Sequence, residues 1–203
     1  MRFGCFSVLI RASFAAAFLT LLVCGASIAA PSSAAKKTIE AAKKGSAKAQ
    51  NEAGYIYAKG EGVTQDWGEA VKWFTKAARQ GYAKAQYNLG HLYALGKGVK
   101  KNTAEAIAWF SKAAAGGDAV AQYSLGLIHA QGMGVRQDIK KAAVWFLKAA
   151  KNGHPVAQLD VGFMYYSGYG LKEDKKQAVK WFKKSAAAGH PLAKSMLKHL
   201  KTD

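Results

Sequence analysis

The chain has 203 residues, a formal net charge of +18 and only two cysteines. Both cysteines lie within the first 24 residues, so the rest of the chain can form no disulfide and must be stabilised by packing. The excess of positive charge predicts anionic surroundings, such as lipid headgroups, acidic glycans or acidic proteins.

Residues 1–29 are predicted to be a cleavable secretory signal peptide. They contain Arg2 and Arg11 but no acidic residue, and an apolar run over 14–23 leads into small residues. The run is shorter than the roughly 20 residues that cross a bilayer, which disfavours an uncleaved anchor. A lipoprotein signal at Cys24 is the other alternative, but valine is a poor residue before a modified cysteine. We therefore expect a periplasmic or secreted protein.

Cleavage after residue 29 removes two arginines and no acidic residue, so the net charge falls from +18 to +16. An exported protein rarely meets nucleic acid, so this charge does not predict a nucleic-acid partner. Removal of Cys5 and Cys24 leaves no thiol in the exported chain.

The remaining chain repeats itself with a period of 36 residues. Tryptophan, phenylalanine, glutamine and glycine all recur at this step, which is the signature of a stacked-repeat protein. The predicted organisation is a flexible segment over 30–37, a partial repeat helix over 38–46, four repeats over 47–82, 83–118, 119–154 and 155–190, and a C-terminal capping helix over 191–203.

Each repeat is predicted to form two helices joined by a glycine-containing loop. Apolar residues recur at helical spacing on both sides of loops such as GKGVKKN. The second helices have good N-cap residues at Asp66, Asn102, Asp138 and Asp174. They are expected to end at left-handed glycines, namely Gly81, Gly117, Gly153 and Gly189.

One helical pair cannot bury its aromatic stripe alone, but stacked pairs can. The strict recurrence of tryptophan therefore predicts a structural core rather than a ligand cage. The core tryptophans are Trp73, Trp109, Trp145 and Trp181. The fold class is predicted to be all-α.

The repeat reads A-x-A-Q-x-x-L-G-x-x-Y, then G-x-G-V, then Asp or Asn, then A-x-x-W-F-x-K-A-A-x-x-G. This pattern resembles the Sel1-like repeat, a relative of the tetratricopeptide repeat, and it covers nearly all of the exported chain. The resemblance implies a right-handed α-solenoid that acts as an adaptor for other proteins, in bacteria often in envelope assembly, signalling or host interaction. One exported subgroup of the family has a disulfide in each repeat. Its binding of cell-wall precursors or lactams is not expected here, because the exported chain has no cysteine.

No catalytic residue, metal ligand or cofactor site is predicted. Half of the twelve acidic residues are assigned to helix capping, and the others show no pairing suited to acid/base catalysis. His129 replaces a recurring tyrosine, which favours a packed side chain over a metal ligand, and His91 has no metal-binding partner at i+4. The glycine pairs follow helices rather than strands and lack the ending of a phosphate loop. We therefore expect a non-enzymatic protein, with a cell-wall hydrolase as a remote alternative.

Partner specificity should reside where the repeats differ. One arc of the first helix varies between repeats and becomes more apolar toward the C-terminus. If these helices line the concave side, as the resemblance implies, the arc predicts a groove for a helix or extended segment of another protein. The groove residues are Tyr87, His91, Tyr123, Leu127, Leu159 and Phe163. The alternative is that neighbouring helices bury some of them.

The second helices carry a recurring lysine, at Lys76, Lys112, Lys148 and Lys184. These lysines favour a solvated convex face, and the alternative is contact with an anionic membrane or acidic glycan. The first hypothesis is thus an exported scaffold that binds a protein or peptide in its groove, and the second is a basic envelope-surface or glycan-binding protein. We expect a monomer, although the terminal partial units leave self-association open.

Overall fold

The computed structural model describes residues 32–200, so the predicted signal peptide lies outside the described residues. This part of the chain forms ten α-helices and no strand, and none of these helices is long and apolar enough to cross a membrane. The helices are α1 (Ser33–Lys43), α2 (Ala47–Lys59), α3 (Trp67–Arg79), α4 (Ala83–Leu95), α5 (Thr103–Ala115), α6 (Ala119–Gln131), α7 (Ile139–Lys151), α8 (Pro155–Ser167), α9 (Lys175–Ala187) and α10 (Pro191–His199). The predicted all-α solenoid is confirmed.

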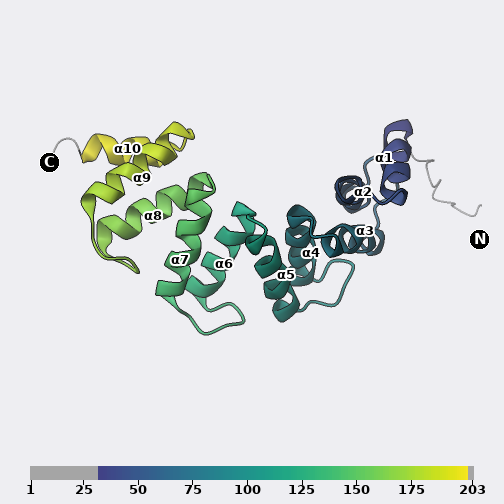
Figure 1. The fold of residues 1–203 in the computed structure, drawn as a ribbon, viewed down its shortest axis with the longest axis horizontal. Helices are drawn as coiled ribbons and strands as arrows, with labels where there is room; N and C mark the ends of the chain where they lie inside the picture. The colour runs from purple at the N-terminus through teal and green to yellow at the C-terminus, as the bar shows by residue number, and fades with distance from the viewer. Residues whose placement is uncertain (1–31, 201–203) are drawn as a thin grey trace, which may run out of the picture.

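Four helical hairpins form the body of the stack. They are α2–α3, α4–α5, α6–α7 and α8–α9, with α1 and α10 at the two ends (Figure 1). Each helix packs against the next one along the chain. Figure 1 shows that the hairpins follow one another along a curved line, with the N-terminal and C-terminal helices far apart.

Hydrogen bonds from local side chains determine where the second helices begin. The four predicted N-cap residues each accept a hydrogen bond from the backbone N–H three residues on, at 2.9–3.1 Å. The first helices end at glycines with positive φ, for example Gly60 at 74° and Gly96 at 72°. The predicted left-handed glycines after the second helices are also confirmed, as Gly81 has a φ of 82°.

Helix α1 begins earlier than the sequence predicted. It starts at Ser33, inside the segment 30–37 for which we expected no regular structure, and it ends at Lys43. The Ser32 hydroxyl accepts a hydrogen bond from the backbone N–H of Ala35, and the Ser32 N–H donates to the carbonyl of Gly62 at 2.9 Å. The helix therefore starts where the chain is both capped and anchored to the α2–α3 loop.

A phenylalanine of the second helix lies directly against a glycine of the first helix in every repeat. A Cβ atom at Gly54 would lie 2.6 Å from Cδ1 of Phe74, and one at Gly90 would lie 2.9 Å from Cδ1 of Phe110. Both distances are too short for carbon atoms that are not bonded. The pairs are Gly54–Phe74, Gly90–Phe110, Gly126–Phe146 and Gly162–Phe182. Glycine is thus needed for the two helices to approach.

A buried glutamine joins each repeat to the element before it. Its side-chain amide donates to a carbonyl near the end of the preceding helix at 3.0–3.2 Å. The pairs are Gln50–Ala42, Gln86–Ala78, Gln122–Ala114 and Gln158–Ala150. The recurrence of glutamine is visible in the sequence, but its role depends on the neighbouring repeat.

The tryptophans are less uniform than their recurrence predicted. Trp73 and Trp181 are 7% and 6% exposed, whereas Trp109 and Trp145 are only half-buried. A lysine three residues later places its Nζ 4.1–4.4 Å from the ring centroid in each repeat. The lysine stem and ammonium group therefore cover the part of the indole that the helices leave open.

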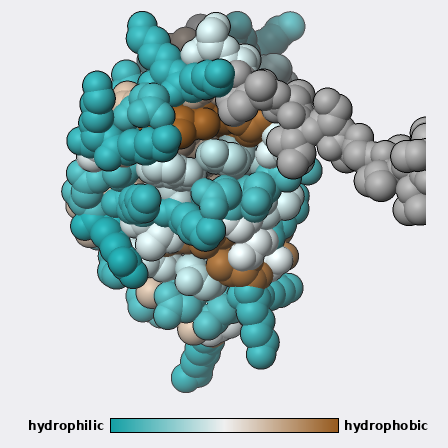
Figure 2. All heavy atoms as spheres, turned by 90° about the vertical axis from the view of Figure 1, so that its right-hand side faces the viewer, coloured by the Kyte–Doolittle hydropathy of each residue, from teal (hydrophilic) through white to brown (hydrophobic). Residues whose placement is uncertain are grey.

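The N-terminal end of the stack has a largely polar surface. Figure 2 looks onto this end, where hydrophilic side chains predominate and brown apolar atoms form only small patches outside the grey segment. Helix α1 buries Ala35, Ile39 and Ala42 and exposes lysines such as Lys36 and Lys43. A polar outer face is typical of a terminal unit that caps a solenoid.

We predict that Gly54→Ala lowers the free energy of unfolding. The added methyl group overpacks the Phe74 ring, which typically costs about 1–3 kcal/mol. Chemical denaturation measures the change. The control is Gly68→Ala, because a Cβ there would meet an Asp66 carboxylate oxygen at 3.2 Å rather than an aromatic ring, and alanine is the better helix former. Equal stability of the two variants would contradict the packing role of Gly54.

We predict that Ala188→Asn stabilises the protein. Gln122 and Gln50 each accept a hydrogen bond on Oε1 from an amide at the end of their own repeat, from Asn152 at 2.9 Å and Gln80 at 2.7 Å. The equivalent residue in the fourth repeat is Ala188, and Oε1 of Gln158 is buried without a hydrogen-bond partner among residues 32–200.

The asparagine supplies the missing donor and should add about 0.5–1.5 kcal/mol to the free energy of unfolding. Ala187→Asn is the control, since it adds the same side chain one residue earlier. If Ala188→Asn is no more stable than this control in urea denaturation, the predicted hydrogen bond does not form.

Candidate functional site

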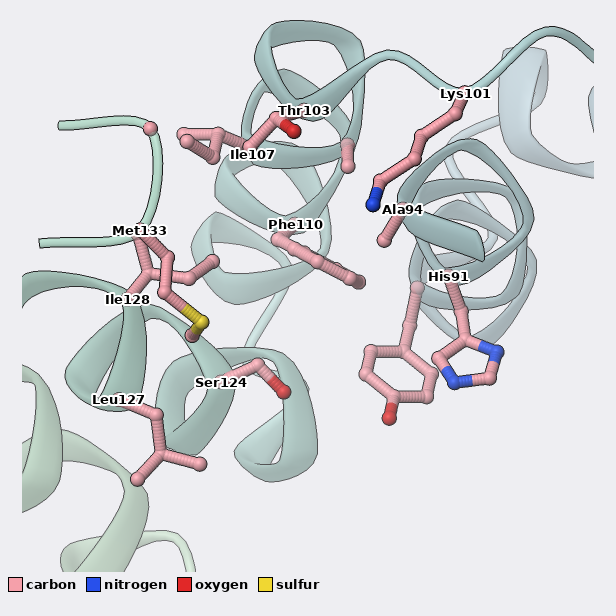
Figure 3. Close-up of a pocket in the computed structure, with 13 residues that line it drawn as sticks. His91, Ala94, Lys101, Thr103, Ile107, Phe110, Ser124, Leu127, Ile128 and Met133 are labelled. Carbon is pink, nitrogen blue, oxygen red and sulfur yellow. The ribbon is translucent and has the colours of Figure 1, made fainter. Parts of the chain in front are cut away.

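A largely apolar cavity of about 400 Å³ lies between the second and third repeats. We call it the repeat 2/3 cavity. Helices α4, α5 and α6 and the two loops that follow α4 and α6 form its walls (Figure 3). Its lining residues are Tyr87, His91, Ala94, Lys101, Thr103, Ala106, Ile107, Phe110, Ser124, Leu127, Ile128, Met133 and Gly134.

A related cavity of about 240 Å³ lies between the third and fourth repeats, and we call it the repeat 3/4 cavity. Every residue that lines it lies one repeat period after a residue of the repeat 2/3 cavity. They are Ala130, Ile139, Ala142, Phe146, Asp160, Phe163, Met164 and Tyr169. The two cavities are therefore copies of one feature with different side chains.

The first residue of each second helix is one of the lining positions at which the two cavities differ. Thr103 has a short side chain at this position, whereas Ile139 occupies it in the smaller cavity. In the first repeat the residue is Trp67, which packs against the core next to Phe74, with the Lys97 ammonium 4.5 Å from the centroid of its ring. Trp67 fills the position that Thr103 leaves open.

Three of the predicted groove residues come together in the repeat 2/3 cavity. Tyr87 is half-buried and packs against Phe110 with the ring centroids 5.5 Å apart. His91 is exposed and stacks on Tyr87 at 6.2 Å, and Leu127 lies on the opposite wall (Figure 3). Phe163, a fourth predicted residue, lines the repeat 3/4 cavity instead.

Tyr123 is half-buried between the third and fourth repeats. Its ring stacks on His154 at 4.4 Å and contacts Phe146 at 5.4 Å. Its hydroxyl donates to a carboxylate oxygen of Asp160 at 3.0 Å. It therefore supports the groove wall and forms part of the contact between repeats.

Leu159 does not belong to an open groove. It is only 5% exposed and packs in a cluster with Ala178, Phe182 and Ala193. The prediction that Leu159 lines the partner-binding groove is wrong, because helices α9 and α10 cover this side chain.

Several cavity residues were not predicted because they lie outside the first helices. Lys101 and Met133 belong to loops, and Thr103 and Ile107 belong to α5. The signal that could have identified them is variation between repeats at loop positions and at the start of the second helix.

Burial changes the acid–base behaviour of the groove. It raises the pKa of Tyr87, and together with the adjacent Asp160 carboxylate it raises the pKa of Tyr123 to about 12. Burial also raises the pKa of Asp160, although the hydrogen bond from Tyr123 opposes this. Partial desolvation by the neighbouring side chains, aided by the charge of Lys97, lowers the pKa of His91, although much of this side chain is exposed.

The arrangement is suited to holding apolar side chains with a few polar contacts. Within residues 32–200 no group of three His, Cys, Asp or Glu side chains could hold a metal ion. His129 is buried, 8% exposed, as expected for a histidine that replaces a packed tyrosine.

The four recurring lysines of the second helices lie elsewhere, over the tryptophan rings. We call Lys76, Lys112, Lys148 and Lys184 the lysine row. All four lysines are exposed. The apolar Val144, on the second helix of the third repeat, is also exposed, at 51%. The row could meet an anionic surface, but each of its members already has an aromatic contact.

We predict that Asp160→Asn stabilises the protein at pH 7 and that the gain shrinks in acid. A carboxyl group whose folded pKa is raised favours folding below its unfolded pKa, near 3.8, and loses that contribution as pH rises through the folded pKa. Asparagine keeps an oxygen acceptor for Tyr123 without the buried charge. Urea denaturation between pH 4 and 8 measures the difference.

Asp138→Asn controls for the loss of one negative charge, because Asn102 serves as the equivalent N-cap. A constant difference between Asp160→Asn and the wild-type protein at all pH values would show that burial of the charge is not its cause.

Comparison with known proteins identifies the repeat. The family model of the Sel1 repeat matches residues 47–82, 83–118, 119–154 and 155–190. A Sel1 repeat protein from Oxalobacter formigenes is 40% identical to this chain, with a TM-score of 0.78. The match covers 82% of this chain and 48% of the Oxalobacter protein. A protective antigen present in uropathogenic Escherichia coli strains, displaying an SLR fold, is 37% identical to this chain, with a TM-score of 0.76. The match covers 82% of this chain and 36% of the antigen.

Helicobacter pylori cysteine rich protein B is more distant, at 26% identity and a TM-score of 0.53 over 68% of this chain and 99% of its own. Comparison with curated proteins finds no match. The chain spans 48% and 36% of the two more similar structures, so it corresponds to a part of each. Sel1 repeats form scaffolds for protein–protein interaction. With four consecutive matches across most of its length, this chain belongs to the Sel1-repeat family.

Proposed function

We propose that this protein is a non-enzymatic, exported scaffold that binds another protein or a peptide through the two cavities between its repeats. The binding surface is the groove side of the solenoid, predicted to be concave. The basic signal-like segment 1–29 supports a periplasmic or secreted location and a role in envelope function, signalling or host interaction.

The observation that carries the proposal is the contrast between constant and variable positions. The glycine, phenylalanine and glutamine residues that build each repeat recur without change. Several cavity positions differ from repeat to repeat. For example, Leu127 and Met133 of the repeat 2/3 cavity are replaced by Phe163 and Tyr169 in the repeat 3/4 cavity. Variation at an accessible apolar surface is expected of a site that selects a partner.

A second candidate function is contact with an anionic membrane or an acidic glycan. The observation in its favour is the lysine row, which presents one exposed ammonium group in each repeat. Such contact would weaken steeply with salt because it depends on screened charges.

A photo-crosslinking residue placed at Met133 or at Val144 distinguishes the two functions. Both side chains are apolar and exposed, at 42% and 51%, but Met133 borders the repeat 2/3 cavity and Val144 lies on a second helix. In envelope extract of the source organism we expect a discrete crosslinked protein with the probe at residue 133 only.

Charge reversal of the lysine row should leave this crosslink unchanged. A crosslink formed only from residue 144, or one abolished by charge reversal, would favour the anionic surface instead. Absence of a crosslink at both positions would contradict the scaffold proposal.

A further inference from the structure

We propose that the repeat 2/3 cavity binds a large apolar side chain of a partner polypeptide that carries an acidic residue next to it. Lys101 pairs with the acidic group while the apolar side chain enters the cavity. The inference rests on the proposed function, because it specifies the partner of the same surface.

The cavity has the size and lining of a site for an apolar group. Its volume of about 400 Å³ falls within the range of about 300–1,000 Å³ that is common for ligand pockets. Ile107, Phe110, Leu127 and Met133 face it from three sides (Figure 3). An extended or helical peptide can place one anchoring side chain in such a pocket.

The positive charge around the cavity favours an acidic residue next to the anchoring side chain of the partner. Lys101 extends its ammonium group from the α4–α5 loop toward the cavity (Figure 3). Lys97 and Lys100 belong to the same loop, and none of the three takes part in an ion pair within residues 32–200. An acidic group beside the anchor would give Lys101 a partner, and it would also be attracted by the net positive charge of the protein.

The repeat 3/4 cavity has the opposite polarity and therefore selects against the same segment. The residue equivalent to Lys101 is Gln137, and the residue equivalent to Ser124 is the acidic Asp160. Like charges brought together at an interface oppose binding. An acidic segment should thus place its anchor between the second and third repeats rather than the third and fourth.

A random peptide library displayed on phage, selected on the immobilised protein, tests the inference. We expect enriched peptides to share Leu, Ile, Met or Phe adjacent to Asp or Glu. A synthetic copy of an enriched peptide should bind Lys101→Glu about fivefold or more weakly than the wild-type protein. Selection on Lys101→Glu should enrich Lys or Arg beside the same apolar anchor.

Thr103→Trp tests the cavity itself. It copies Trp67 of the first repeat, so the variant should fold while its indole fills the pocket. We expect the synthetic peptide to bind it at least about tenfold more weakly, and Thr103→Ile, which copies Ile139, to show an intermediate loss. Circular dichroism verifies the helix content of both variants.

Lys183→Glu is the charge-matched control, because this exposed lysine lies on α9, away from the cavity, and its reversal should not change peptide affinity. If no peptide is enriched, the proposed function fails at this surface. If peptides bind but Lys101→Glu and Lys183→Glu have equal effects, or Thr103→Trp binds as well as the wild-type protein, the present inference is overturned while the scaffold function remains.

Discussion

In every repeat a phenylalanine ring lies against a helical glycine, and this contact brings the two helices of the hairpin together. The absence of a Cβ at residues such as Gly54 and Gly90 allows the ring to lie against the backbone of the first helix. The hairpin thereby buries a large apolar side chain within one repeat. The buried glutamines then link each hairpin to the preceding helix, so the same geometry is carried along the stack.

Because the hairpin geometry is the same in each repeat, equivalent positions can be compared directly. The same position carries Trp67, Thr103 and Ile139 in the first three repeats. Trp67 packs against the core, whereas Thr103 and Ile139 line cavities of about 400 and 240 Å³. The cavities thus differ through substitutions within the repeat rather than through insertions. This arrangement also permits neighbouring cavities to differ in charge, as Lys101 and Asp160 do, without any change in the packing of the hairpins.

The positive charge of the protein has a structural component. Each lysine of the lysine row places its ammonium group over a tryptophan ring, where a cation–π contact contributes about 0.5–1 kcal/mol at an exposed site. The cation–π contact explains why a lysine recurs at this position without the need for an anionic partner. In the α4–α5 loop, Lys97 lies over Trp67, and Lys101 faces the cavity. Neither forms an ion pair within the described part of the chain, residues 32–200.

The helical repeat, its length, its N-cap residues and its left-handed glycines could be predicted from the amino-acid sequence, because they depend on local periodicity and backbone preference. Tyr87, His91 and Leu127 could also be predicted as neighbours, since they lie on corresponding faces of successive first helices. The burial of Leu159 by α9 and α10, and the approach of Lys101 and Met133 to the cavity from loops, became visible only in the folded structure. Accessibility and cavity shape arise from contacts between repeats, and no pattern within a single repeat contains them.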